Sequence, residues 1–136
     1  MIQKYALNKI SSLKIDIDKP SIVFLKWDLW AGKTTLSQKI IKDLGVISDV
    51  TSPTYTYYNS YYSESQNIPI YHFDLYRMSD YEEFIHIWGE EILDNNEGII
   101  LIEWPQILEK YYTADVEISL KYTEKDNERE VEIIQK

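Results

Sequence analysis

The feature that most constrains the fold of this chain is an apolar run that leads through a short loop into a helix-like segment. Residues 21–25 are mostly β-branched or aromatic, and residues 34–44 place apolar side chains at helical spacing. The loop between them ends in Gly32-Lys33-Thr34. A strand, a loop ending in Gly-Lys-Thr and a helix form the layout of a phosphate-binding loop. The sequence therefore predicts an α/β domain that binds a nucleotide.

This loop has the chemistry that a nucleoside triphosphate requires. Backbone N–H groups of such a loop, together with the helix N-terminus, attract phosphates. Lys33 can reach the β- and γ-phosphates, and the Thr34 hydroxyl can bind Mg²⁺. The predicted nucleotide-binding residues of the loop are Asp28, Leu29, Trp30, Ala31, Gly32, Lys33, Thr34 and Thr35. Because the tripeptide Gly-Lys-Thr also arises by chance at helix starts, the assignment depends on the rest of the sequence.

Length and charge limit what this chain can do by itself. Its 136 residues suit a single domain over 1–136 with one core. It has no cysteine and no apolar run of membrane-spanning length, so we expect a soluble cytoplasmic protein. A net charge of -9 argues against direct binding of DNA or tRNA, since phosphate backbones are held by Lys and Arg. Any role in an RNA pathway is therefore expected to operate through a partner.

The pattern along the chain predicts a P-loop NTPase-like three-layer sandwich. Its central sheet is expected to be mostly parallel, because residues 98–103 form a continuous apolar run typical of a strand covered on both faces. Antiparallel additions, including a C-terminal hairpin, complete the predicted sheet. The expected strands are 21–26, 54–62, 70–75, 98–103, 115–122 and 129–135, and the expected helices are 4–13, 34–44, 81–87, 90–93 and 105–111.

Two acidic residues lie where such a sheet binds its ligands, at the carboxyl ends of strands. Glu103 ends the run 99–102 and can hold Mg²⁺ directly or through water; alternatively, it is a solvated acid at a strand end. Asp74 shares a strand face with His72 and can orient the attacking water. A structural pair between Asp74 and Arg77 is the alternative. The predicted catalytic residues are Lys33, Asp74 and Glu103, and the predicted metal ligands are Thr34 and Glu103.

Two further segments each leave two interpretations open. The hydroxyl-rich turn 51–54 either senses the γ-phosphate, as switch loops do, or is an ordinary loop. Eight of the twelve tyrosines lie between Tyr55 and Tyr81. Such density can serve base stacking, but tyrosines also pack well on both faces of strands, and we favour this packing interpretation.

Together, the motifs at 27–35, 51–55, 72–77 and 102–105 resemble the TsaE family (formerly YjeE). The resemblance implies a bacterial P-loop ATPase required for threonylcarbamoyladenosine modification of tRNA, with ATP and Mg²⁺ as ligands. It places Lys33 and Thr34 in the loop, makes Glu103 the metal-side acid and Asp74 a functional carboxylate, and sets Trp104 beside the nucleotide. It also implies TsaB and TsaD as partners, with tRNA contacted only indirectly.

The chain departs from the family's pattern at two loop positions. Trp27 and Trp30 stand where the family has glycine. Glycine accepts positive φ, and a bulky residue in that conformation is strained, which would weaken nucleotide binding. Alternatively, the indoles point away from the phosphates. A non-hydrolysing interaction subunit of the same fold is therefore a second hypothesis. A small-molecule P-loop kinase is a third, disfavoured because the chain has only two arginines and no obvious lid.

Overall fold

The computed structural model describes residues 2–6, 9, 15–17, 20–27, 33–51, 53 and 56–135. The predictions for loop residues 28–32, for residues 52 and 54 of the hydroxyl-rich turn, and for residue 55 lie outside this part of the chain. In chain order the elements are β1 (Ile2–Ala6), β2 (Ser21–Trp27), α1 (Lys33–Asp43), β3 (Tyr58–Ser63), β4 (Ile68–Asp74), α2 (Tyr81–His86), α3 (Gly89–Asp94), β5 (Ile99–Glu103), the 3₁₀ helix η2 (Pro105–Leu108), β6 (Val116–Tyr122) and β7 (Glu128–Gln135).

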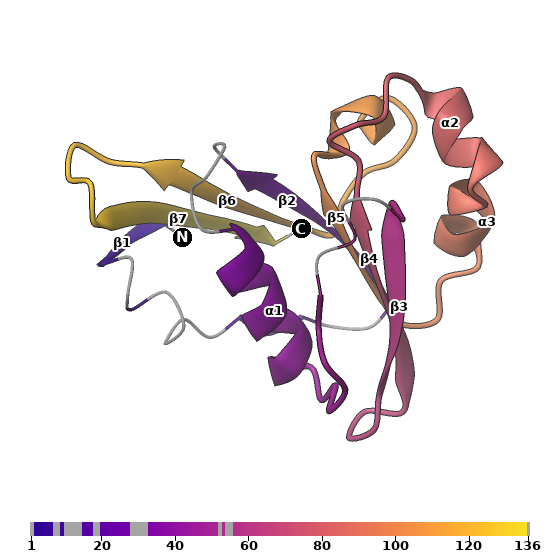
Figure 1. The fold of residues 1–136 in the computed structure, drawn as a ribbon, viewed down its shortest axis with the longest axis horizontal. Coiled ribbons are helices and arrows are strands. Elements are labelled where there is room, and N and C mark those ends of the chain that lie inside the picture. Colours follow the sequence, from indigo (N-terminus) through magenta and orange to yellow (C-terminus); the bar gives the residue numbers. More distant parts are fainter. Residues whose placement is uncertain are drawn as a thin grey trace.

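The described strands form a seven-stranded mixed sheet in the order β1-β7-β6-β2-β5-β4-β3. Strands β6, β2, β5 and β4 run parallel at its centre, whereas β7, β1 and β3 add antiparallel edges. Figure 1 shows α1 on one face of this sheet and α2 and α3 on the other. The predicted three-layer α/β architecture, with its parallel core and C-terminal hairpin, is confirmed.

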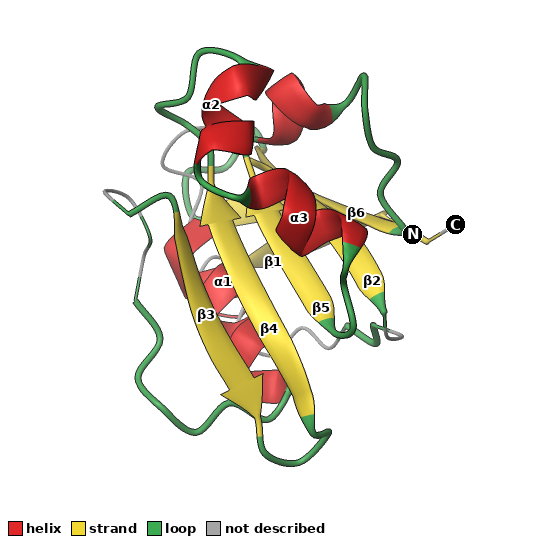
Figure 2. Cartoon of the chain, turned by 90° about the vertical axis from the view of Figure 1, so that its right-hand side faces the viewer, coloured by secondary structure: helices red, strands yellow, loops and turns green. Residues whose placement is uncertain are grey.

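The alternating side chains of β5 build the core on both faces of the sheet. Ile99 and Leu101 are fully buried on the side of α1, where Leu36 also packs. Ile100 and Ile102 are equally buried on the opposite side, within the cluster that contains Phe84 of α2. Figure 2 shows α3 in front of β4 and β5 with α1 behind them. A strand covered on both faces has no polar side to present, which explains its continuous apolar sequence.

Two predicted helices were wrong in type or length. The prediction of a helix over 4–13 is contradicted at its start, because β1 occupies Ile2–Ala6 and pairs antiparallel with β7. Pairing with a distant strand overrides a weak local periodicity. The predicted helix 105–111 is shortened to the single turn of η2, Pro105–Leu108.

The helical segment after β4 is divided at Trp88 rather than at Gly89. Trp88 has φ of 68°, in the left-handed region, while Gly89 is the first residue of α3. A Cβ added to Gly89 would lie 2.5 Å from the ring of Phe84, so glycine is needed here for close packing. Among the described residues, no helix has the length and apolar character needed to cross a membrane.

The tyrosines near β3 and β4 are engaged in packing. The Tyr58 ring lies 5.1 Å from the ring of Phe73 and 6.3 Å from that of Tyr71, measured between centroids. Both distances fall within the range of favourable aromatic pairs. These contacts support the packing interpretation of the tyrosine-rich segment.

Candidate functional site

The carboxyl ends of three parallel strands converge beside the start of α1. Glu103 at the end of β5 is in register with Asp74 of β4 on one side and with Leu25 of β2 on the other. Because side chains alternate along a strand, His72 and Asp74 share the face of Ile70, which packs on the α1 side. We call the cluster Trp27, His72, Asp74 and Glu103 the carboxyl-end cluster.

Glu103 is the centre of this cluster. Its side chain is buried, with the residue only 2% exposed, and both of its carboxylate oxygens have partners. The indole N–H of Trp27 donates to Oε1 at 2.8 Å. His72 Nε2 lies 2.6 Å from Oε2. A carboxylate is held in a fixed plane when donors bind its two oxygens from different directions.

The surroundings of His72 indicate which ring nitrogen carries the proton. An ionised carboxylate only accepts hydrogen bonds, so Nε2 must be the donor to Glu103. The other nitrogen, Nδ1, is buried and has no hydrogen-bond partner among the described residues. A lone pair left there costs less than an unpaired N–H group, so the tautomer with the proton on Nε2 satisfies this site best.

Asp74 lies beside Glu103 and is also buried, at 4% exposure. Its Oδ1 accepts the backbone N–H of Tyr76 at 3.1 Å, which caps the turn that follows β4. The backbone N–H of Asp74 itself donates to the carbonyl of Tyr57 at 2.8 Å. Leu75 donates its N–H to the carbonyl of Glu103 at 3.1 Å, so the ends of β4 and β5 are joined by the main chain as well.

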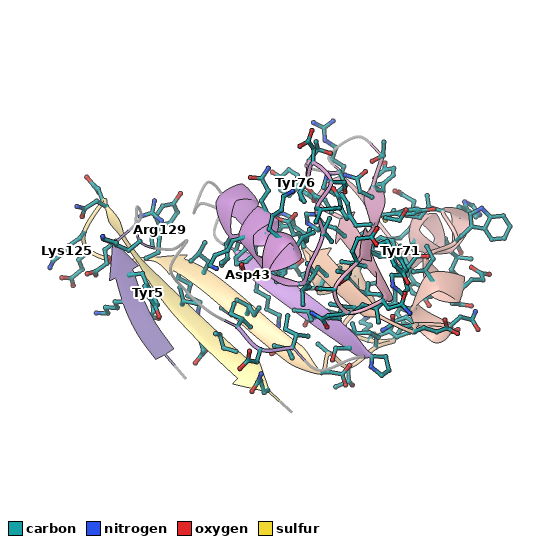
Figure 3. All side chains as sticks on the ribbon, turned by 90° about the horizontal axis from the view of Figure 1, so that it is seen from below. Tyr5, Asp43, Tyr71, Tyr76, Lys125 and Arg129 are labelled. Atoms are coloured by element: carbon teal, nitrogen blue, oxygen red, sulfur yellow. The ribbon has the colours of Figure 1, made fainter. Side chains whose placement is uncertain are left out.

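Two non-glycine residues adopt left-handed backbone conformations at this end of the sheet. Tyr57, whose carbonyl accepts from Asp74, has φ of 66°, and Trp104, which follows Glu103, has φ of 57°. The half-buried ring of Trp104 lies 5.0 Å from that of Tyr76. Figure 3 shows Tyr76 at the upper side of the molecule in that view. Such strained conformations cluster at functional sites.

The helix that follows the loop is suited to an anion at its start. Helix α1 begins at Lys33 and has no acidic residue in its first turn. The positive end of its dipole is therefore not offset by a neighbouring carboxylate of its own. The side chains of Lys33, Thr34 and Thr35 lie outside the described part of the structure, as does the loop 28–32. Their roles remain predictions.

Trp27 does not have the strained loop conformation that the sequence suggested. Trp27 is the last residue of β2, in register with Leu120 of β6, and its φ is not among the positive values. An extended backbone accepts tryptophan without strain. The contact between its indole and Glu103 was missed, since nothing in the local sequence links positions 76 residues apart.

A magnesium ion at the carboxyl-end cluster remains a prediction, for which the acids present have suitable chemistry. Asp74 and Glu103 supply carboxylate oxygens, which this ion prefers. No group of three or more His, Cys, Asp or Glu side chains that could hold a metal is found among the described residues. At nucleotide sites, Mg²⁺ is held by one or two protein ligands together with phosphate oxygens and water.

The first residue of the hydroxyl-rich turn is tethered to the edge strand β3. Thr51 donates its backbone N–H to the Tyr61 hydroxyl at 3.2 Å, and Asn59 Nδ2 donates to the Thr51 carbonyl at 3.2 Å. Thr51 itself is exposed. The structure thus fixes where the turn begins, while its proposed response to the γ-phosphate remains a prediction.

Among the described residues, Tyr81 and Tyr112 have a raised pKa, and both lie on the face of the sheet opposite the carboxyl-end cluster. Burial raises the pKa of Tyr81, with further contributions from hydrogen bonds to Tyr112 and Glu90. Burial also raises the pKa of Tyr112, whose hydroxyl lies 3.1 Å from Asp94 Oδ1. These tyrosines join α2 and α3 to the segment after η2 and form no part of the carboxyl-end cluster.

Comparisons with known proteins agree with this architecture. The family model described as threonylcarbamoyl adenosine biosynthesis protein TsaE matches residues 3–131. The tRNA threonylcarbamoyladenosine biosynthesis protein TsaE of Haemophilus influenzae is 38% identical over 126 residues, covering 90% of this chain and 75% of that protein. Its counterpart in Borreliella burgdorferi is 37% identical over 131 residues, covering 96% and 93%. The crystal structure of Bacillus subtilis YdiB superposes with a TM-score of 0.57 at 24% identity, covering 96% of this chain and 83% of that one, and supports the fold.

Proposed function

The chain belongs to the TsaE family of tRNA threonylcarbamoyladenosine biosynthesis, and from this premise we propose that it is the Mg²⁺-dependent P-loop ATPase subunit of that pathway. One observation carries the proposal. Buried Glu103 and Asp74 lie in register at the carboxyl ends of adjacent parallel strands, beside the strand that leads into the Gly-Lys-Thr loop. This is where a P-loop domain places its metal-side acid.

Each residue of the site has a distinct task in this proposal. The loop 28–32 and the N-terminus of α1 bind the phosphates, with Lys33 on the β- and γ-phosphates. Thr34 and Glu103 would hold Mg²⁺, which, when bound, offsets charge on the transferred phosphoryl group. Asp74 orients the attacking water, for which the hydrogen bond to the Tyr76 N–H fixes its carboxylate. Trp104 lies beside the nucleotide.

We further propose that TsaB and TsaD homologues are the partners, and that the protein acts in the cytoplasm. The net charge of -9 opposes tRNA binding by the isolated chain, so tRNA is reached through these partners. In this arrangement the protein does not transfer the threonylcarbamoyl group itself. Its hydrolysis of ATP acts on the TsaB–TsaD complex between turnovers.

The first experiment measures phosphate release from ATP by the protein alone and with TsaB–TsaD. Lys33→Ala is expected to abolish productive nucleotide binding while the protein remains folded, because the role proposed for this lysine is to bind the phosphates. Retention of full hydrolysis by this variant would contradict the loop assignment. Nucleotide-dependent binding to TsaB–TsaD without phosphate release from the parent protein would support the non-hydrolysing interaction subunit instead.

A further inference from the structure

We propose that Trp27 is a positioning residue that holds the Glu103 carboxylate in the orientation required for magnesium binding. The inference rests on the proposed function and extends it to a residue outside the family's loop pattern, which has glycine at this position. A glycine has no side chain that could donate to Glu103. In this chain, the indole therefore supplies a hydrogen bond that the family pattern does not provide.

Burial makes this contact specific. Trp27, His72 and Glu103 are 5%, 2% and 2% exposed, so water cannot readily replace either hydrogen bond to the carboxylate. Hydrogen bonds to a charged group in such surroundings are among the strongest in proteins. The donors come from β2 and β4, which flank β5 on its two sides. Because the two donors approach from opposite sides, they fix the plane of the carboxylate. Rotation about the bond that joins the carboxylate to the side chain would break both contacts.

This arrangement leaves Glu103 able to bind its ion. Each carboxylate oxygen has two acceptor positions, and the contacts with Trp27 and His72 use one on each. The remaining positions can receive Mg²⁺ or a water bound to it. A carboxylate that is already oriented loses little freedom when the ion arrives, so its supporting donors contribute to metal affinity.

The backbone of Trp27 explains why the exchange of glycine for tryptophan is tolerated. Trp27 is an extended residue of β2 that pairs with Leu120 of β6. Its ring packs in the core cluster that also contains Val23, Leu25 and Leu36. Packing of the ring could therefore be the whole role of Trp27. A test has to separate the packing of the ring from the hydrogen bond of the N–H group.

Trp27→Phe makes that separation, because it keeps an aromatic ring and removes the donor. Trp88→Phe is the matched control, since the same exchange is made at an indole that is 68% exposed. The first measurement is the indole N–H region of a ¹⁵N–¹H correlation spectrum of the protein without ligand. We expect the Trp27 signal, identified by its loss in Trp27→Phe, to exchange with solvent far more slowly than that of Trp88, and to move when Glu103 is changed to Gln.

The second measurement is Mg²⁺ affinity, titrated on the protein saturated with a non-hydrolysable ATP analogue. Trp27→Phe is expected to weaken Mg²⁺ binding roughly tenfold, as removal of a supporting donor does at other metal sites. Binding of the analogue without Mg²⁺ should change less than about twofold, and Trp88→Phe should change neither, as expected when only the metal-side acid is affected.

The outcomes separate the two proposals. A parent protein that binds the analogue and Mg²⁺, with Trp27→Phe binding the ion equally well, overturns the positioning role alone. Tighter Mg²⁺ binding by Trp27→Phe also overturns it, because the indole would then compete with the ion for Glu103. A parent that binds no Mg²⁺–nucleotide at all overturns the proposed function, and the positioning role with it.

Discussion

Two regions of this sheet bury charged groups, and they do so in different ways. At the carboxyl ends of the parallel strands, Glu103 is held by Trp27 and His72, which come from strands distant in sequence. At the hairpin of β6 and β7, Arg129 is also buried, but it donates to the carbonyls of Asp126 and Glu128 in its own hairpin. Figure 3 shows Arg129 and Lys125 at the end of the molecule opposite the helices α2 and α3.

The two charged groups differ in where their partners come from. The contacts of Arg129 close a turn, and its guanidinium also lies 4.6 Å from the centre of the Tyr122 ring, on the paired position of β6. Those partners would be present in an isolated hairpin. The carboxyl-end cluster draws on three neighbouring parallel strands, and the first of them, β2, precedes the loop that leads to α1. Convergence of distant groups on a buried acid is therefore the stronger sign of a ligand site.

The largest expected effect tests the carboxyl-end cluster. Glu103→Gln should lower the rate of phosphate release by roughly 100-fold or more, because the variant keeps the shape and loses the charge that faces the metal. The amide oxygen can still accept from Trp27, but the amide NH₂ group then faces the Nε2–H of His72, so a modest fall in melting temperature should accompany the loss of activity. Phosphate release and thermal unfolding are measured on the same preparation. Full activity with a much lower melting temperature would assign Glu103 to structure.

The next effect concerns the neighbouring acid. Asp74→Asn should lower phosphate release roughly 10- to 100-fold, a loss typical of groups that orient a reacting water. The amide oxygen can still accept the Tyr76 N–H, which preserves the turn after β4. Nucleotide affinity, measured separately with a labelled analogue, should stay near that of the parent. A loss of affinity without a loss of turnover would show that Asp74 holds the ligand rather than the water.

A change at the hairpin should produce the opposite pattern. Arg129→Met is expected to cost on the order of 2 kcal/mol of unfolding free energy, because it removes the hydrogen bonds from the guanidinium to the carbonyls of Asp126 and Glu128 and its contact with the Tyr122 ring. Activity per folded molecule should remain at the parent level. Urea unfolding followed by circular dichroism gives the stability, and phosphate release below the transition gives the activity. Impaired hydrolysis in fully folded protein would erase the contrast between the two regions.

The smallest effect isolates one contact of the same hairpin. Tyr122→Leu removes the ring beneath Arg129 and keeps an apolar side chain on β6. Because the ring is 46% exposed, a loss of about 0.5–1 kcal/mol is expected from the cation–π contact. If Arg129→Met is made first, Tyr122→Leu should then cost almost nothing in urea unfolding. Additive losses would mean that the ring and the guanidinium do not interact.

The parallel core could be predicted from sequence because its pattern is local. The run 99–103 is apolar at every position before Glu103, as only a strand buried on both faces requires, and the loop residues Gly32 to Thr34 mark the start of α1. The same reasoning located Glu103 and Asp74 at one edge, because parallel strands end together. These inferences needed no knowledge of which strands are neighbours.

Other features depend on contacts between distant segments and could not be read from the sequence. The start of the predicted helix 4–13 proved to be part of β1, because its pairing with β7 cannot be seen in the local sequence. Trp27 was treated as a defect of the loop because its acceptor, Glu103, is known only once β2 and β5 are seen side by side. In both cases a partner elsewhere in the chain overrode what the local pattern indicated.

The position of β2 between β5 and β6 has a consequence for how the protein is made. β2 contains residues 21–27, yet its two neighbours are residues 99–103 and 116–122. Contacts of such large sequence separation form slowly, because a long loop must close before they yield any stabilisation. During synthesis β2 emerges early, and one of its edges stays unpaired until β6 has left the ribosome. A truncated chain that ends before β6 would therefore expose one edge of β2 and tend to aggregate.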